Sequence, residues 1–528
     1  MNIEPIPVVD LFAGPGGLGE GFSSLTLDEQ RGFKIVLSVE KDGCAHSTLT
    51  LRAFFRQFPR GEAPDDYYDY LRGSISRDEL FRRWPGAAAA AQDEARLMTL
   101  GVDDPTDLIS SRIADHKRWI LIGGPPCQAY SLVGRSRMLG GIQRLPGESD
   151  AEYRKRRSEE FSTDHRHELY RQYLKIIARF WPSIFVMENV RGILSSEFHG
   201  DKIFPRILDD LRDPASVFPS GGKHFQYRIF SLAHALDSKT GTARPDDYLV
   251  KSELYGIPQA RHRVILVGVR SDLGIDQIPL LVPERELTVR DVLDDLPPLS
   301  SGLSRKTKKA PVEALKEILK QPVEGLAKSA TQSRLFERMR EMLDLAIAEE
   351  RRGGRFVASG SVAADGWFRD SRLGGYCNHE SRSHIKEDLW RYFFAACYAK
   401  VHGRSPLLRD FPLLLLPSHR NVSAGVKDNK FGDRFRVQIE NRPATTVTSH
   451  ISKDGHYFIH YDPRQYRCLT VREAARLQTF PDNYFFEGPR TEQYHQVGNA
   501  VPPLLAKKIA EIVFKTLSSV QLRPEFPL

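Results

Sequence analysis

Cysteine is scarce in this sequence, and its few copies lie far apart. The 528 residues include five cysteines, an odd number without any CxxC pair: Cys44, Cys127, Cys377, Cys397 and Cys468. Disulfide frameworks and zinc sites need cysteines in pairs or at close spacing. The sequence therefore predicts neither a disulfide-stabilised protein nor a zinc protein, and it favours a reducing compartment.

Long apolar runs and low-complexity tracts are also missing. FPLLLLP at 411–417 is far shorter than the roughly 20 residues that span a bilayer. The N-terminal MNIEPIPVVDLF has neither the basic region nor the apolar core of a signal peptide. We expect a cytoplasmic protein without a membrane partner.

The composition is that of a large globular protein with a small excess of positive charge. Hydrophobic residues make up 41% of the chain and charged residues 27%, which argues against disorder, and the length indicates two or three domains. The formal net charge of +8 favours a polyanionic partner, although this excess is modest for the length.

Short apolar runs alternate with helix-like stretches in the first part of the chain. The runs are PVVDLF at 7–12, KIVLSVE at 34–40, WILIGG at 119–124, SIFVMENV at 183–190 and RVILVGV at 263–269. Amphipathic stretches such as HELYRQYLKIIARF at 167–180 lie between them. Buried strands that alternate with helices are typical of α/β proteins, so we predict a doubly wound, mostly parallel sheet.

This alternation stops near residue 285. RLFERMREMLDLAIAEERRGG at 334–354 predicts an amphipathic helix that ends at the two glycines, and NAVPPLLAKKIAEIVFKTL at 499–517 predicts a closing helix. We therefore predict a first domain at 1–285, a smaller inserted domain at 286–440, and a return to the first domain at 441–528.

A glycine-rich turn follows the first predicted strand. DLFAGPGG places Gly14, Gly16 and Gly17 where a strand turns into a helix. Glu40 ends the next strand, where a carboxylate can accept both hydroxyls of a ribose. The spacing differs from the GxGxxG of dinucleotide binders, so it favours an adenosine cofactor without a diphosphate. Taken alone, the motif fits an ordinary glycine turn better.

Further polar side chains fall at predicted strand ends. Cys127 follows WILIGG and two prolines, Glu188 belongs to SIFVMENV, and Arg261 and Arg263 stand at the start of RVILVGV. Each has a plain alternative: a buried cysteine, a helix-capping glutamate, and solvated arginines. The carboxyl ends of parallel strands meet at one edge of an open sheet, where ligands bind, so together these residues favour one catalytic site with a cysteine nucleophile.

The order of these motifs resembles that of the DNA (cytosine-5)-methyltransferases that use S-adenosylmethionine. The matching segments are DLFAGPGG, Glu40, PPCQ, ENVRG, QARHR, RPATTVTSH and QVGNAVPP, in the order of that family. The resemblance implies the Rossmann-like fold of class I methyltransferases. It makes 1–285 the catalytic domain, 286–440 the target-recognition domain, and 441–528 the return to the catalytic domain.

The resemblance also implies a site for S-adenosyl-L-methionine. Its predicted residues are Phe12, Gly14, Gly17, Glu40, Pro125, Leu169, Asn499 and Val501. The aspartate that meets the adenine in this family has four candidates here, Asp103, Asp104, Asp107 and Asp115. Lys41 stands where the family often has a tryptophan that stacks on the adenine.

The predicted chemistry is covalent catalysis on a cytosine flipped out of the duplex. Thiolate attack by Cys127 on C6 would turn C5 into a nucleophile for the methyl group. Glu188, in a desolvated pocket, would assist at N3, while Arg263 and Arg261 would hold O2 and orient Glu188. The base that removes the C5 proton is not identified by the sequence.

Two basic parts of the sequence are candidate DNA contacts. The segment after Cys127, which includes YRKRR at 153–157, is predicted to be a lid that meets phosphates, with a solvated insertion as the alternative. Arginines of the inserted domain, for example Arg372, Arg382 and Arg420, are candidates for reading guanines.

We therefore expect a sequence-specific, bacterial-type enzyme that acts on double-stranded DNA and is competent as a monomer. The resemblance implies a restriction-modification or phage-defence system, with a cognate restriction endonuclease as a partner. Two alternatives stay open: methylation of tRNA by the same chemistry, and a non-catalytic DNA-binding protein that keeps the fold. The large inserted domain argues against the first, and the intact Cys127, Glu188 and Arg263 argue against the second.

Overall fold

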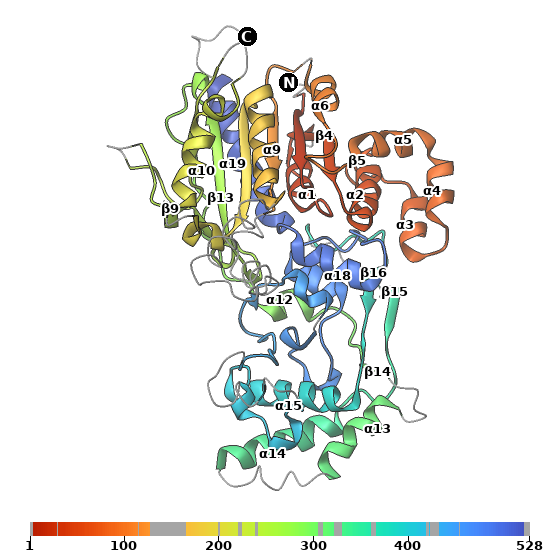
Figure 1. Cartoon of the computed structure of the whole chain (residues 1–528). Helices are drawn as coiled ribbons and strands as arrows, with labels where there is room; N and C mark the ends of the chain where they lie inside the picture. Colours follow the sequence, from red (N-terminus) through yellow and green to blue (C-terminus); the bar gives the residue numbers. More distant parts are fainter. Residues whose placement is uncertain are drawn as a thin grey trace, which may run out of the picture.

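The chain forms two lobes (Figure 1). The described residues between 4 and 285 and between 501 and 521 form the sheet lobe, and those between 286 and 500 form the second lobe. The computed structural model describes residues 4–28, 30–114, 116–126, 165–198, 201–219, 224–237, 241–304, 310–320, 330–360, 366–418, 422, 432–453 and 455–521. Within these ranges, every helix is either too short or too polar to cross a bilayer.

An eight-stranded sheet is the centre of the sheet lobe. Its order is β10-β13-β7-β6-β1-β4-β5, with β11 paired to β13. The strands are β1 (Ile6–Leu11), β4 (Phe33–Glu40), β5 (Ala95–Leu97), β6 (Ile120–Gly123), β7 (Ile184–Val190), β10 (Tyr227–Phe230), β11 (Leu249–Lys251) and β13 (His262–Arg270). The strands from β5 to β7 are parallel, whereas β13 is antiparallel to its neighbours. The predicted α/β fold with a mostly parallel sheet is confirmed.

Helices cover both faces of this sheet. α1 (Gly17–Ser23) and α19 (Pro503–Gln521) share a buried cluster with one face, and α9 (His165–Phe180) and α10 (Ile203–Arg212) with the other. Successive strand residues point to opposite faces, so Val8 packs in the first cluster and Val9 in the second. The doubly wound arrangement leaves the carboxyl ends of the parallel strands free to form a site.

Three short helices extend the sheet lobe beside its last parallel strand. After α2 (Gly43–Arg56) come α3 (Asp65–Arg72), α4 (Arg77–Arg83) and α5 (Pro85–Glu94), and the chain then enters β5. Phe54, Tyr67 and Leu71 anchor them in a buried cluster. Figure 1 shows this group at the right, next to β15 of the second lobe. The lobe also contains α6 (Thr106–Ile113), α11 (Pro214–Val217), and the strand pairs β2 (Thr26–Leu27) with β3 (Gln30–Arg31) and β8 (Glu197–Phe198) with β9 (Asp201–Lys202).

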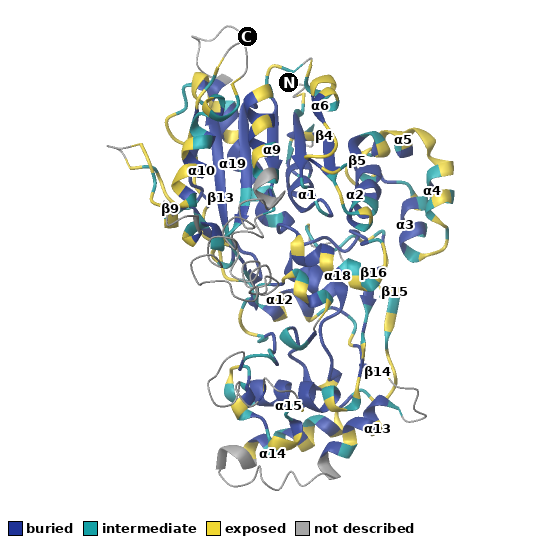
Figure 2. Ribbon diagram, in the orientation of Figure 1, coloured by how far each residue is buried: buried dark blue, intermediate teal, exposed yellow. Residues whose placement is uncertain are grey.

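The second lobe has a hydrophobic core of its own (Figure 2). Its helices are α12 (Val289–Leu293), α13 (Pro311–Lys316), α14 (Ala330–Asp344), α15 (Lys386–His402), α17 (Val471–Leu477) and α18 (Arg490–Asn499). Its strand pairs are β14 (Gly302–Leu303) with β17 (Ser383–His384) and β15 (Gly353–Ala358) with β16 (Gly375–Glu380). One buried cluster runs from Val289 to Ala500, so the segment 441–500 packs with this lobe, and α19 then returns to the sheet. The domain boundary at 440 stays a prediction.

The helix predicted at 334–354 is shorter than expected. α14 ends at Asp344, and Gly353 begins β15 instead of stopping a helix. Beyond Asp344 the backbone N–H of Ile347 donates to the carbonyl of Arg464 (3.1 Å). A long-range backbone contact therefore ends the helix early, and local sequence gives no sign of it.

Candidate active site

Close backbone contacts shape the glycine turn after β1. Phe12 has a φ of 58°, and Gly14 and Gly16 have φ values of 58° and 98°, so the chain turns sharply before α1 begins. A Cβ on Gly17 would lie 2.2 Å from the carbonyl oxygen of Val501, which leaves no space for a side chain. A Cβ on Gly14 would meet nothing within 4 Å. The turn is closed against Val501 and has free space beside Gly14.

Glu40, the last residue of β4, is hydrogen-bonded to this turn. Its Oε2 accepts a hydrogen bond from the Gly14 N–H and its Oε1 accepts one from the Asp42 N–H, both at 2.8 Å. These bonds form because β1 and β4 are neighbouring parallel strands that end together. A carboxylate has about four acceptor positions, so Glu40 keeps acceptor capacity for the hydroxyls of a ribose.

Two apolar positions predicted for the cofactor pack against one hydrophobic cluster. Phe12 and Leu169 are partly buried against the same hydrophobic cluster. Met98, which follows β5, belongs to that group, and its N–H donates to the Glu40 carbonyl (2.9 Å). Met98 was not among the predicted residues, and its position directly after a parallel strand is the sequence signal that points to it.

Two of the four candidate aspartates accept hydrogen bonds from nearby backbone N–H groups. Asp103 accepts a bond from the backbone N–H four residues earlier (2.7 Å), and Asp104 accepts one from the N–H two residues later (3.0 Å). Asp107 is exposed in the first turn of α6. Asp115 lies outside the described residues.

The end of the chain comes back to the glycine turn. Asn499 is the last residue of α18, and its Nδ2 lies 3.4 Å from both ring nitrogens of His495. Val501 follows, with its carbonyl against Gly17. Val501 is therefore brought to the predicted cofactor turn, almost 500 residues away in sequence, and Asn499 lies two residues before it in the chain.

Glu188 and Arg263 form an ion pair at the ends of adjacent strands. Arg263 Nε lies 2.7 Å from Glu188 Oε1, with the side chains 13% and 15% exposed, respectively. The antiparallel register sets Arg263 opposite Val190, two residues beyond Glu188, so both side chains lie on the same face of the sheet. Both side chains are mostly buried, and a small part of each remains accessible to solvent.

This ion pair lies against the segment that leads to Cys127. A Cβ on Gly124 would be 2.9 Å from Glu188 Oε2, and Asn189 Nδ2 donates to the Pro125 carbonyl at 3.4 Å. Cys127 itself lies outside the described residues, as does the basic segment predicted to be a lid. Glu188 therefore lies against Gly124, which is three residues before the predicted nucleophile in the sequence.

Arg261 makes different contacts from Arg263. It is buried, and its Nη1 and Nη2 donate to the carbonyls of Val447 (2.7 Å) and Gly498 (3.3 Å). Burial lowers the pKa of Arg261 well below its usual value, and the nearby positive charge of Arg263 acts in the same direction. Arg261 thus joins the two lobes, and its predicted contact with a cytosine stays a prediction.

Two arginines predicted to read bases are engaged within the protein. Arg372 Nη2 donates to Asp65 Oδ1 at 2.7 Å. Arg382 Nη2 donates to the Ile451 carbonyl at 2.6 Å, and its guanidinium lies 3.8 Å from the centre of the Tyr494 ring. These contacts argue against base reading by either residue. Arg420 lies outside the described residues.

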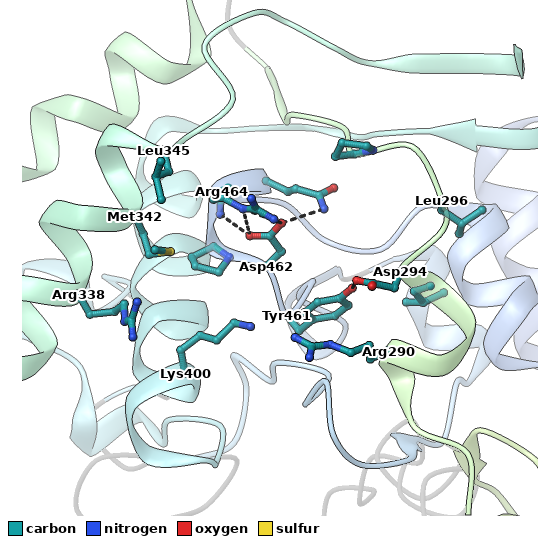
Figure 3. A pocket seen from close by; sticks show the side chains of 14 residues that line it. Arg290, Asp294, Leu296, Arg338, Met342, Leu345, Lys400, Tyr461, Asp462 and Arg464 are labelled. Carbon is teal, nitrogen blue, oxygen red and sulfur yellow. Dashed lines mark hydrogen bonds and ion pairs between the residues drawn. The ribbon is translucent and has the colours of Figure 1, made fainter. Parts of the chain in front are cut away.

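A pocket of about 420 Å³ in the second lobe is a separate feature. It lies between α12, α14, α15 and the segment 461–465. In Figure 3, Arg464 is bonded to Asp462, and the Tyr461 hydroxyl points toward Asp294. The four basic side chains that line it all have carboxylate partners: Arg290 and Lys400 with Glu440, Arg338 with Glu341, and Arg464 with Asp462. With its charges so balanced, the pocket has little attraction for a phosphate.

Comparisons with known proteins identify the family of the chain. Residues 101–214 and 247–515 match the family described as C-5 cytosine-specific DNA methylase. The chain is 33% identical to the type II methyltransferase M.Bpa9945I of Bacillus paralicheniformis, over 96% of this chain and 98% of that protein. It is 26% identical to the type II methyltransferase M.AgeI of Thalassovita gelatinovora, over 97% of this chain and 99% of that protein.

A solved structure shares the fold. It is described as a DNA modification methyltransferase encoded within an E. coli prophage, and it has a TM-score of 0.50 at 18% identity, with 97% of this chain and 99% of that chain covered. The family match spans well over half of the sequence, and the identity to M.Bpa9945I extends over nearly all of it. The chain therefore belongs to the C-5 cytosine-specific DNA methylase family and is a DNA (cytosine-5-)-methyltransferase.

Proposed function

We propose that this enzyme transfers a methyl group from S-adenosyl-L-methionine to C5 of a flipped cytosine within one recognition sequence of double-stranded DNA. The observation that carries this proposal is the Glu188–Arg263 ion pair, packed against Gly124 just before Cys127. The Glu40 turn lies at the carboxyl ends of β1 and β4, in the same sheet. A methyl donor and a reacting base would therefore meet at one edge.

Cys127 would act as the nucleophile. Its thiolate forms a bond to C6 of cytosine, and the electron pair of the C5–C6 double bond then becomes available at C5. C5 takes up the methyl group, loses its proton to a base, and the sulfur–C6 bond breaks as the double bond reforms. S-adenosylmethionine, when bound, supplies the electrophilic methyl group.

Glu188 and Arg263 would direct this attack. A carboxyl group hydrogen-bonded to N3 assists the addition at C6, because it stabilises the charge that moves onto the ring. Arg263 holds Glu188 in place through the 2.7 Å ion pair and leaves part of its guanidinium for the cytosine O2. The base must leave the duplex to reach this edge.

The cofactor would lie on the turn between β1 and α1. Glu40 would accept the ribose hydroxyls, Phe12 and Leu169 would border the adenine, and Asn499 and Val501 would close the site from the C-terminal side. Pro125 and Gly14 would line the remainder. The free space beside Gly14 and the remaining acceptor positions of Glu40 support this assignment.

The cellular role would be modification of host DNA. Relatives that align over almost the whole chain are named type II methyltransferases. We infer a restriction-modification system with a cognate restriction endonuclease, and through it a part in phage defence. A monomer would suffice, since one cytosine on one strand is modified at a time.

Transfer of labelled methyl groups in vitro tests the function. Purified enzyme should label plasmid DNA and leave tRNA unlabelled, and Cys127→Ala should abolish labelling while Cys44→Ala retains it. Duplex DNA with 5-fluorocytosine should form an adduct at Cys127, because fluorine cannot leave as a proton does. Labelling of tRNA alone would indicate the other substrate, and active Cys127→Ala would exclude the covalent mechanism.

A further inference from the structure

The helices α3–α5 of the sheet lobe meet the second lobe around residues 366–377, beside β15 and β16 (Figure 1). We propose that Arg372 is a positioning residue: with Tyr68 and Asp370 it clamps the second lobe onto α3 and so fixes the angle at which that lobe presents DNA to the catalytic edge. The DNA part of this inference rests on the proposed function.

Arg372 reaches across the lobe boundary to three groups. Its Nη1 donates to the Gly61 carbonyl at 2.8 Å and its Nη2 to Asp65 Oδ1 at 2.7 Å. Its guanidinium carbon lies 4.6 Å from the centre of the Tyr68 ring. A planar guanidinium held by two acceptors and an aromatic face has a defined orientation, so this contact restrains direction as well as distance.

Asp370 makes a second polar contact between the second lobe and α3. Its Oδ2 accepts hydrogen bonds from the Tyr68 hydroxyl and from Asn483 Nδ2, both at 2.7 Å. Asn483 Oδ1 in turn accepts from Arg52 Nη1 at 3.0 Å, and Arg52 belongs to α2 of the sheet lobe. Asp370 is therefore held by α3 and, through Asn483, by α2.

Apolar and stacking contacts complete the clamp. Leu373 and Phe485 of the second lobe share a buried cluster with Tyr67 and Leu71 of α3. Arg355 of β15 donates to the Tyr70 carbonyl at 3.0 Å. Its guanidinium carbon lies 4.7 Å from the Tyr70 ring centre and 4.2 Å from that of Phe485. The interface thus combines polar contacts, which fix the relative orientation of α3 and the second lobe, with a buried apolar cluster, which fixes their separation.

The two lobes are also joined at a second junction, away from α3. At this junction β12 (Gln259–Ala260) pairs with β18 (Ala444–Thr445), and Arg261 bonds to the carbonyls of Val447 and Gly498. Two bodies joined at one place can hinge about it, which is the usual source of interdomain motion. The lobes also meet along α2, where the Thr48 hydroxyl donates to Gln496 Oε1 at 2.7 Å and accepts from the Glu487 N–H at 2.8 Å. Loss of the clamp should therefore loosen the lobes on the α3 side while these contacts remain.

Arg404 offers a matched control. It pairs with Asp410 at 2.8 Å and its guanidinium carbon lies 5.0 Å from the Tyr398 ring centre, so it has the same kinds of contact as Arg372. All of its partners belong to the second lobe. Arg372→Ala and Arg404→Ala therefore remove similar interactions, and only the first removes them between lobes.

The test compares these variants in steady-state methylation of plasmid DNA and in small-angle X-ray scattering of the free protein. Arg372→Ala should raise KM for DNA about fivefold with KM for S-adenosylmethionine nearly unchanged, and it should increase the radius of gyration. Arg404→Ala should match the wild type in all three quantities. Equal behaviour of the two variants would overturn the proposal.

A second variant and the scattering measurement cover two cases in which kinetics of Arg372→Ala alone would not decide. Should Arg372→Ala fail to fold, Tyr68→Phe removes only the hydroxyl bonded to Asp370, and the same changes are expected from it at smaller size. Should the wild type methylate no DNA, the proposed function fails, and the scattering comparison alone then decides whether Arg372 clamps the lobes. An unchanged radius of gyration in that case would exclude the clamp.

Discussion

Glu188 is the residue whose surroundings bear most directly on the chemistry. It stands between the ion pair with Arg263 and the backbone of Gly124. A glutamate that only capped a helix would not need either contact. The arrangement holds the carboxyl group in one place beside the segment that leads to Cys127.

Replacement of this carboxyl group should affect turnover more than binding. We expect Glu188→Gln to lower kcat by roughly 10²–10⁴-fold, the usual contribution of a general acid or base, with little change in the KM for S-adenosylmethionine. Glu253→Gln is the control, since Glu253 also pairs with a β13 residue, His262, at 2.7 Å. Steady-state kinetics of both variants would check this, and equal kcat values would remove Glu188 from the mechanism.

Asp10 is a second unusual carboxyl group, buried within β1. Neither of its oxygens has a hydrogen-bond partner among the described residues, and burial raises its pKa to about 8. The folded state therefore binds a proton that the unfolded state loses near pH 4. Stability should fall as the pH rises from about 4 to about 8, by up to about 1.4 kcal/mol per pH unit.

Asp10→Asn should remove that pH dependence, because an amide does not ionise. The variant should have a higher Tm than the wild type at pH 8, and this advantage should be smaller at pH 5 by up to about 4 kcal/mol of unfolding free energy. Asp276→Asn is the control, since Asp276 is largely exposed. Thermal unfolding at both pH values checks this, and a pH-independent difference would show that Asp10 is already ionised at pH 5.

At the scale of elements, the strand-end motifs could be predicted and the contacts between distant segments could not. Glu40 and Glu188 come late in apolar runs, so their place toward one sheet edge follows from the α/β pattern, whereas Arg263 begins its run and reaches that edge because β13 is antiparallel to β7. The early end of α14 and the carbonyl partners of Arg261 depend on residues more than 100 positions away. Local pattern carries no information about such partners.

The glycine turn has no space for a side chain at Gly17. Gly17→Ala would place a Cβ 2.2 Å from the Val501 carbonyl, so α1 or the segment before α19 must move. We expect a loss of about 1–3 kcal/mol in stability and weaker binding of S-adenosylmethionine. Gly86→Ala is the control, because a Cβ there meets nothing within 4 Å. Calorimetric titration would check this, and wild-type affinity in Gly17→Ala would contradict the assignment of the turn.

At the scale of the whole molecule, the sequence predicted two functional parts and missed how they are joined. The change of pattern near residue 285 marks the beginning of the second lobe. The helices α3–α5 were not predicted, and their packing against Leu373 and Phe485 of the second lobe appears only in three dimensions. The hydrophobic core likewise continues beyond 440, because α17 packs against α12, α18 and β16.

We propose that this enzyme methylates C5 of cytosine in DNA through Cys127, and bisulfite sequencing of cellular DNA detects the 5-methylcytosine that this reaction forms. DNA from cells that express the wild type should contain cytosines protected from conversion at one short sequence, and DNA from cells that express Cys127→Ala should contain none. Absence of protected cytosines in the wild-type sample, or equal protection in both samples, would contradict the account.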